Sequence, residues 1–239
     1  TDYLLSQVKS NNELSVLCLN LLFKRENQDI HAINYDLINS ESLDLKYAAM
    51  NNCLRYDFNN KDQIKNEIND NLNQNINCQY ILKYIHPDNL KLDSNQFINI
   101  SQDLDYESIV YSLDFMEGLD NSKVWDCIID NCYKQSFIDS KLIKFFDRAN
   151  QEEIFNYFEL QLLDSDSLID KKIFINELVL ELDSKKAINI YESFFKQPYK
   201  DDYTFDKVCD SIIEIKGNDK ANTIDNQLIF KLIEELTDS

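Results

Sequence analysis

Residues 29–57, DIHAINYDLINSESLDLKYAAMNNCLRYD, decide the fold because they contain two amphipathic segments joined by a short polar connection. The first segment places four aliphatic side chains on one face of a helix of 3.6 residues per turn: Ile30, Ile33, Leu37 and Ile38. The connection, NSES at 39–42, consists of residues that favour turns and helix caps. The second segment directs five side chains inward: Leu45, Ala48, Ala49, Cys53 and Leu54. We therefore expect two helices folded back on each other, with Asp29 capping the first.

Two adjacent alanines on the second segment allow a neighbouring helix to approach closely, since helix separation depends on side-chain size at the contact. Five residues of this segment follow the pattern of acid, aliphatic, base, small residue and aliphatic: Asp44, Leu45, Lys46, Ala49 and Cys53. Here the chain resembles the second helix of a HEAT repeat, with lysine where arginine is usual and without the proline common in the first helix. The resemblance implies a stack of helical hairpins, an α-solenoid, and no particular activity.

The rest of the chain repeats this rhythm. Apolar residues recur at helical spacing in units that begin near Tyr106, Phe137, Leu168 and Thr204, which are 31, 31 and 36 residues apart. Helical repeats have periods of roughly 30 to 47 residues. We expect an all-α fold of stacked antiparallel helical hairpins, HEAT-like but irregular, as a single elongated domain over residues 1–239. The polar segment 88–103 is the best candidate for a long loop or a break between two stacks.

Several local predictions can be checked. A helix from Asn12 to about Lys24 is expected to bury five side chains: Leu14, Leu17, Cys18, Leu21 and Leu22. Turns are expected at Gly118, at 183–184 and at 216–219, and the last helix is expected to contain Leu228, Ile229, Leu232 and Leu236. The segment 172–182, KIFINELVLEL, is rich in branched residues and could form a strand, but its length favours a helix.

The formal net charge is -19, from 43 acidic and 24 basic residues. Nucleic acids and anionic membrane leaflets repel such a surface. A basic protein partner would be attracted at long range, while the alternative is that the acidity only keeps the chain soluble. Six acids are our candidate partner-binding residues: Asp164, Asp166, Asp170, Asp201, Asp202 and Asp206. Acids at helix starts are also favoured by the helix dipole.

Six cysteines would permit three disulfides, but Cys18, Cys53, Cys132 and Cys209 fall on apolar helical faces, where a free cysteine acts as a small hydrophobe. We expect a reducing compartment, the cytoplasm. No apolar run approaches the roughly 20 residues of a membrane span. Because the chain starts at Thr1 without methionine, export stays open.

Signatures of catalysis or cofactor binding are lacking. The chain has only two histidines, His31 and His86, and too few glycines for a phosphate-binding loop. Cys127 and Cys132 are not spaced as a zinc knuckle or redox pair. A calcium loop beginning at Asp164 would need an acid, a glycine and a glutamate at positions that hold other residues. We therefore expect no metal and no cofactor.

Our functional hypothesis is a non-enzymatic module that binds a basic partner protein through an acidic helical surface. A narrower alternative is an immunity or antitoxin-like protein that neutralises a basic toxin such as a nuclease. A second alternative is an enzyme of unmarked type that uses acidic residues, which a deep pocket with two acids of raised pKa would reveal. Trp125 and the 13 tyrosines could line a binding groove or form the core.

Overall fold

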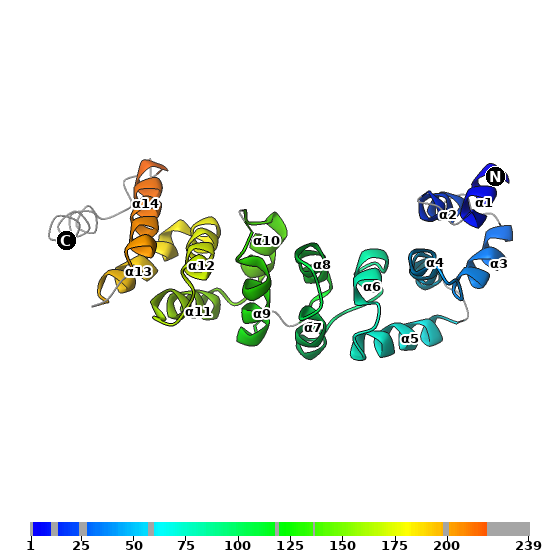
Figure 1. The fold of residues 1–239 in the computed structure, drawn as a ribbon, viewed down its shortest axis with the longest axis horizontal. Helices are drawn as coiled ribbons and strands as arrows, with labels where there is room; N and C mark the ends of the chain where they lie inside the picture. Colours follow the sequence, from blue (N-terminus) through cyan, green and yellow to red (C-terminus); the bar gives the residue numbers. More distant parts are fainter. Residues whose placement is uncertain are drawn as a thin grey trace. The chain divides into compact units, whose positions relative to one another are not determined.

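A computed structural model describes residues 2–10, 14–23, 28–56, 60–117, 120–135, 137–197 and 201–218 (Figure 1). Within these ranges the chain is all-α, as predicted, and an isolated bridge between Leu92 and Met116 is the only β-type pairing. The segment 172–182 lies inside a helix, which decides against the strand alternative. Apolar stripes at three- and four-residue spacing cause this outcome, because they give each segment one face that can be buried only in helical form.

The helices form two compact units, Thr1–Gly118 and Leu119–Ser239. The described helices of unit 1 are α1 (Asp2–Lys9), α2 (Ser15–Phe23), α3 (Gln28–Leu37), α4 (Leu43–Arg55), α5 (Lys61–Asn73), α6 (Cys78–Tyr84), α7 (Ser94–Ser101), α8 (Tyr106–Ser112) and the short 3₁₀ helix η1 (Leu113–Phe115). Those of unit 2 are α9 (Ser122–Cys132), α10 (Ser140–Arg148), α11 (Gln151–Leu163), α12 (Ile169–Leu182), α13 (Ser184–Phe195) and α14 (Asp202–Asn218). That the whole chain is one elongated domain stays a prediction.

Helices two apart in the sequence pack side by side within each unit. In unit 1, α4 lies between α2 and α6, α6 packs against α8, and α5 packs against α7. Figure 1 shows α4, α6 and α8 in one row with α5 and α7 in a second row beneath it. In unit 2, α12 packs against both α10 and α14, and α11 packs against α13. Each unit is therefore built of alternating helices in two layers.

The hairpin predicted from residues 29–57 is formed by α3 and α4. The five side chains expected to point inward on α4 are all buried: Leu45, Ala48, Ala49, Cys53 and Leu54. Asn34 of α3 is buried at this contact, and its Nδ2 donates hydrogen bonds to the carbonyl of Ala49 (3.0 Å) and to Sγ of Cys53 (2.8 Å). The small residues of α4 thus admit α3 closely enough for a side chain to bond the α4 backbone. Since α3 begins at Gln28, Asp29 lies within its first turn rather than before it.

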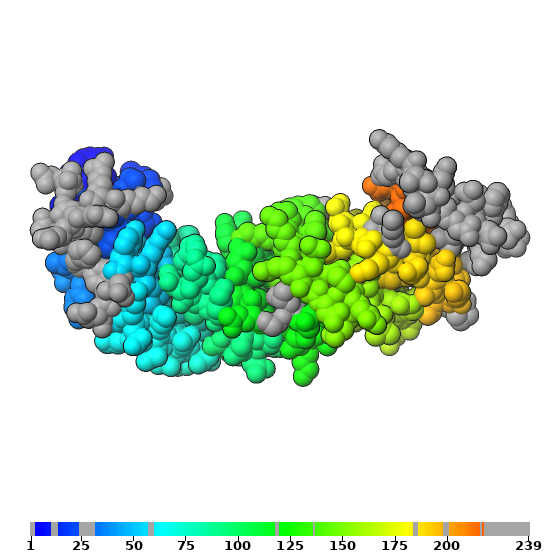
Figure 2. All heavy atoms as spheres, turned by 180° about the vertical axis from the view of Figure 1, so that it is seen from behind, coloured from blue at the N-terminus to red at the C-terminus, as the bar shows by residue number. Residues whose placement is uncertain are grey.

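Aromatic rings fill much of the core of unit 2. Phe146 contacts Phe145 and Phe158 edge to face, with ring centroids 5.3 and 5.5 Å apart. Trp125 packs on Tyr157 at 5.3 Å and is only 3% exposed. In the space-filling view of Figure 2, the atoms of residues 140–182, coloured green to yellow, lie next to one another on the surface of the unit. Trp125 is therefore a core residue, which excludes it from an open binding groove.

The helix expected at 12–24 exists as α2, but the prediction of its burial was partly wrong. Cys18 and Leu22 are buried, whereas Leu14, Leu17 and Leu21 are 51%, 56% and 39% exposed. The reason is that α2 packs against α1 and α4 with the side that carries Cys18 and Leu22, which leaves Leu14, Leu17 and Leu21 outside the packed contact.

The segment 88–103, the best candidate from the sequence for a long loop or a break between two stacks, contains α7. Asp93 and Gln96 form a capping box at its start: the Asp93 carboxylate accepts hydrogen bonds from the backbone N–H of Gln96 (2.9 Å), and Gln96 Oε1 accepts from the N–H of Asp93 (3.2 Å). The chain before α7 is held by Leu92, whose N–H donates to the carbonyl of Phe115 (2.8 Å) and whose carbonyl accepts from the N–H of Glu117 (3.0 Å). The segment is therefore an integral part of unit 1.

The turn expected at 216–219 is also corrected, because α14 continues as helix to Asn218. A glycine exposed to solvent there costs helix stability without ending the helix. The turn expected at Gly118 and the last helix expected from Leu228 to Leu236 lie outside the described residues.

Candidate functional site

The six acids selected from the sequence lie at one end of unit 2. The end of α9, the start of α12 and the start of α14 lie close together there, as two ion pairs show. Lys171 Nζ at the start of α12 lies 2.9 Å from Asp130 Oδ1 near the end of α9. Lys172 Nζ lies 3.6 Å from Asp201 Oδ2, immediately before α14. At the other end of the unit, the N–H of Asn150 donates to the carboxylate of Asp120 (2.6 Å).

Five of the six carboxylates at this end are exposed: Asp164, Asp166, Asp170, Asp202 and Asp206. Asp164 also accepts a hydrogen bond from the backbone N–H of Asp166 (3.0 Å), which orders the turn before α12. Asp201 differs from the others because it is half-buried. Burial would raise the pKa of Asp201, but hydrogen bonds from Thr204 and the charge of Lys172 outweigh it and hold the pKa below its ordinary value. Asp201 is therefore a structural residue, and five acids face solvent.

Exposed apolar side chains share this end of the unit. Phe137 belongs to the α9–α10 turn, Leu168 and Ile169 to the start of α12, and Tyr203 to the start of α14, and each is between 43% and 59% exposed. We call these four residues and the five exposed acids the acidic edge. Exposed apolar residues rimmed by charge are typical of protein-binding surfaces. The sequence pointed to the acids and not to these four apolar residues, because Phe137 and Leu168 were assigned to the apolar pattern of the helical units.

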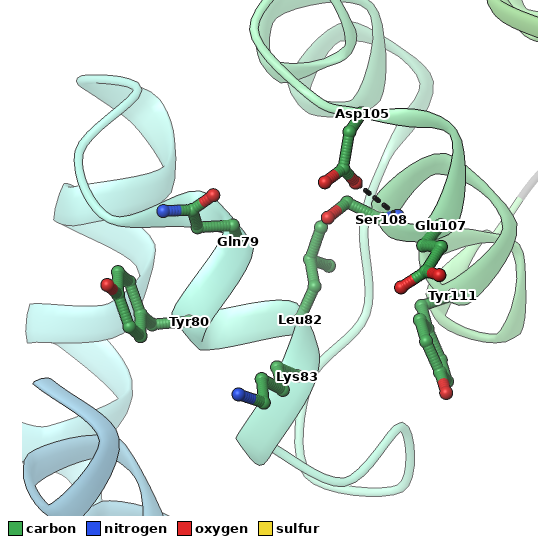
Figure 3. A pocket seen from close by; sticks show the side chains of 8 residues that line it. All are labelled: Gln79, Tyr80, Leu82, Lys83, Asp105, Glu107, Ser108 and Tyr111. Atoms are coloured by element: carbon green, nitrogen blue, oxygen red, sulfur yellow. Dashed lines mark hydrogen bonds between the residues drawn. The ribbon is translucent and has the colours of Figure 1, made fainter.

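Unit 1 contains a hollow of about 440 Å³ between α6 and α8 (Figure 3). Its lining combines polar and charged side chains with Leu82 and two tyrosines, and consists of Gln79, Tyr80, Leu82, Lys83, Asp105, Glu107, Ser108 and Tyr111. Sequence reasoning missed this hollow. The position of α8 beside α6 could not be derived from spacing along the chain.

The charged groups of the hollow are partly committed to structure. The Ser108 side chain and backbone N–H hold the pKa of the Asp105 carboxyl below its ordinary value, and this N–H lies 2.8 Å from Oδ1. Lys83 Nζ lies 3.4 Å from Asp44 Oδ1 and 4.9 Å from the ring centre of Tyr84, whose hydroxyl donates to the same carboxylate. Figure 3 shows the Lys83 ammonium group directed away from Asp105 and Glu107.

This arrangement offers carboxylates and tyrosines but no assembled reactive group. The lining residues include neither histidine nor cysteine. General acid catalysis by a carboxyl group requires a raised pKa, whereas the pKa of Asp105 is lowered. The pKa of Glu177 is raised by burial, but this residue lies on α12, outside the hollow. The hollow therefore gives no support to the enzyme alternative.

All six cysteines are free thiols, and only Cys127 is not fully buried. Burial raises the pKa of Cys53 and Cys78 to about 11 and that of Cys132 to about 12. These three thiols are therefore protonated at neutral pH, and the thiolate is the form that attacks substrates or binds metals. In the described ranges no three His, Cys, Asp or Glu residues are grouped so that they could hold a metal ion.

No protein-family model matches the chain, and no curated protein or solved structure matches it either. Among the helices whose residues are described, none combines the length and the apolar character needed to cross a membrane.

Proposed function

We propose that this chain is a non-enzymatic module that binds a basic partner protein through the acidic edge of unit 2. The observation that carries the proposal is the presence of five exposed carboxylates and four exposed apolar side chains at one end of the unit. In protein interfaces, apolar and aromatic side chains supply most of the affinity, and charges at the rim supply orientation and association rate. The net charge of -19 attracts a basic partner and repels an acidic one.

A HEAT-like repeat organisation and a cytoplasmic location are parts of this proposal. The close contact of Asn34 with Ala49 and Cys53 supports the first, together with the side-by-side packing of alternate helices within each unit. The burial of Cys18, Cys53, Cys78, Cys132 and Cys209 as unbridged thiols supports the second, because such thiols persist in a reducing compartment.

The test is capture of the partner from the cell in which the chain occurs, with three forms of the protein as bait. The edge variant carries Asp164→Asn, Asp166→Asn and Asp170→Asn. The matched control carries Asp147→Asn, Glu152→Gln and Glu192→Gln, which neutralise three exposed acids elsewhere in unit 2. We expect the wild type and the control to retain the same basic protein at low salt and to release it at high salt, and the edge variant to retain much less.

Equal retention by the edge variant and the control would show that total charge matters and the edge does not. Retention that ignores salt in all three forms would refute recognition by charge. If the captured protein is an enzyme that loses activity in the complex, the narrower immunity-like hypothesis applies.

A further inference from the structure

The hollow between α6 and α8 is a surface feature of unit 1 that the acidic edge does not involve. Its eight lining residues belong to α6, to α8 and to the residue before α8, all within the continuously described range 60–117. Its volume of about 440 Å³ falls in the range of ligand pockets, about 300–1,000 Å³. The hollow can therefore receive a complete side chain of another molecule.

Two carboxylates line the hollow from the start of α8. The N–H of Ser108 donates to Asp105 Oδ1 at 2.8 Å, which holds this carboxylate in place and keeps its pKa below the ordinary value. A carboxylate has about four acceptor positions, so Asp105 can accept further hydrogen bonds. Glu107 is exposed and forms no hydrogen bond or ion pair with any residue of the described ranges. Both carboxylates can therefore bind a donor that enters the hollow.

Lys83, the single cation among the eight lining residues, does not neutralise these two carboxylates. Its Nζ lies 3.4 Å from Asp44 Oδ1 on α4 and 4.9 Å from the ring centre of Tyr84. Figure 3 shows its ammonium group directed away from Asp105 and Glu107. Asp44 therefore compensates the charge of Lys83, and the α8 side of the hollow keeps an uncompensated negative charge.

A long cationic side chain matches this combination of groups. Leu82 is 3% exposed and offers an apolar wall to the methylene groups of such a side chain. Tyr111 is 53% exposed and lies four residues after Glu107, on the same face of α8. A guanidinium group fits better than an ammonium group, because its planar set of five N–H donors can serve two carboxylates and stack on an aromatic ring.

The open form of the hollow distinguishes a polypeptide side chain from a free small molecule. Small-molecule sites bury about 70–90% of the ligand surface. Here Asp105, Glu107 and Tyr111 are all exposed, so the hollow encloses only one side of its occupant. An extended segment of another protein can cover the open side with its own backbone and insert a single side chain.

We propose that the hollow between α6 and α8 binds an arginine side chain from a basic segment of another protein, with the guanidinium group held by Asp105 and Glu107. One side chain in an open hollow is expected to bind with a dissociation constant between about 0.1 and 10 mM. The proposal concerns unit 1 alone, so it can hold or fail independently of the function proposed for the acidic edge of unit 2.

The test is an NMR titration of the full chain with the blocked peptide acetyl-Gly-Arg-Gly-amide. We expect the backbone amide signals of Leu82, Ser108 and Tyr111 to shift and to saturate. The same peptide with lysine should have a dissociation constant at least about threefold higher, because an ammonium group cannot pair bidentately. The same peptide with citrulline, which has the shape of arginine without its charge, should give no saturable shift.

Charge-neutral variants locate the site. The hollow variant carries Asp105→Asn and Glu107→Gln, and asparagine retains the ability to cap α8. The matched control carries Glu41→Gln and Asp70→Asn, which neutralise two exposed acids elsewhere in unit 1. We expect the dissociation constant of the hollow variant to be at least about fivefold higher than that of the control. The edge variant of unit 2 should bind the arginine peptide as the wild type does.

Four results would overturn the proposal. The wild type could show no saturable shift up to about 20 mM peptide. The hollow variant could bind as tightly as the control, which would mean that only total charge matters. The lysine or the citrulline peptide could bind as tightly as the arginine peptide. If the hollow variant loses the amide pattern of folded α8, Glu107→Lys replaces it, because this change leaves the Asp105 cap in place and should abolish binding; unchanged binding by Glu107→Lys is the fourth.

Discussion

Replacing Asp201 with asparagine should destabilise unit 2 by about 2–3 kcal/mol. The Lys172 side chain is only 8% exposed, and its ammonium group pairs with the Asp201 carboxylate at 3.6 Å. Removal of one partner from a buried ion pair costs about 3–5 kcal/mol, because the other charge is left without compensation. Asp201 is 24% exposed, so water replaces part of the lost interaction and the lower figure applies. In the wild type, the N–H of Thr204 donates to Asp201 Oδ1 at 2.7 Å. Asparagine at this position keeps an oxygen that can accept this hydrogen bond.

The companion variant Lys172→Met should change stability by less than about 1 kcal/mol, since an apolar side chain of similar length needs no partner. The double variant should resemble Lys172→Met, which gives a coupling energy of about 2 kcal/mol. Urea unfolding followed by tryptophan fluorescence measures all three, because Trp125 is the only tryptophan in the chain and lies in the core of unit 2. This reasoning would be refuted if Asp201→Asn lowered the free energy of unfolding by less than about 0.5 kcal/mol. It would also be refuted if Lys172→Met lowered it by more than Asp201→Asn does.

The same pair predicts how the stability of unit 2 depends on pH. The pKa of Asp201 in the folded chain lies below its ordinary value of 3.8, so its ionised form stabilises the fold at any pH above that value. This contribution should disappear as the pH falls from about 3.8 through the lower folded-state pKa. Urea unfolding at neutral and acidic pH should therefore show a smaller acid loss for Asp201→Asn than for the wild type. If the wild type and Asp201→Asn lost the same unfolding free energy on acidification, the predicted role of the Asp201 carboxylate would be contradicted.

Two further predictions concern packing and thiol reactivity. Ala49→Leu should lower the free energy of unfolding by about 1–3 kcal/mol, because Ala49 is fully buried where α3 packs on α4. Ala32→Leu, on the exposed side of α3, should change it by less than about 0.5 kcal/mol. Urea unfolding followed by circular dichroism measures both variants. A coloured aromatic disulfide reagent should modify one thiol of the native chain quickly, and Cys127→Ser should abolish this fast phase, since the other five cysteines are buried. A fast phase that survives this substitution would show that one of the buried thiols is accessible.

Local patterns predicted the helices well because the signal lies within each segment. The inward set on α4 and the helix at 172–182 both follow from spacing along the chain. The helix α7 was missed because its apolar residues are sparse, although Asp93 and Gln96, three positions apart, were a usable capping signal.

Burial was harder to predict than helix type, because it depends on which neighbours a helix has. The periodicity of α2 is the same whether Leu17 faces another helix or solvent. The hollow at Leu82 likewise exists only because α8 lies beside α6. Of the candidate site, the sequence supplied the six acids, while their gathering at one end depended on contacts such as that of Lys172 with Asp201.

The pairing of Leu92 with Phe115 and Glu117 has a consequence for local opening of unit 1. These two backbone bonds join the strand-like residue before α7 to the residues after α8, so both helices are enclosed in one covalent and hydrogen-bonded ring. While both hydrogen bonds are formed, α7 and α8 are held together at this point. When one of the two hydrogen bonds breaks, the second becomes exposed to water. Solvent exchange at the amides of Leu92 and Glu117 should therefore be a single concerted event.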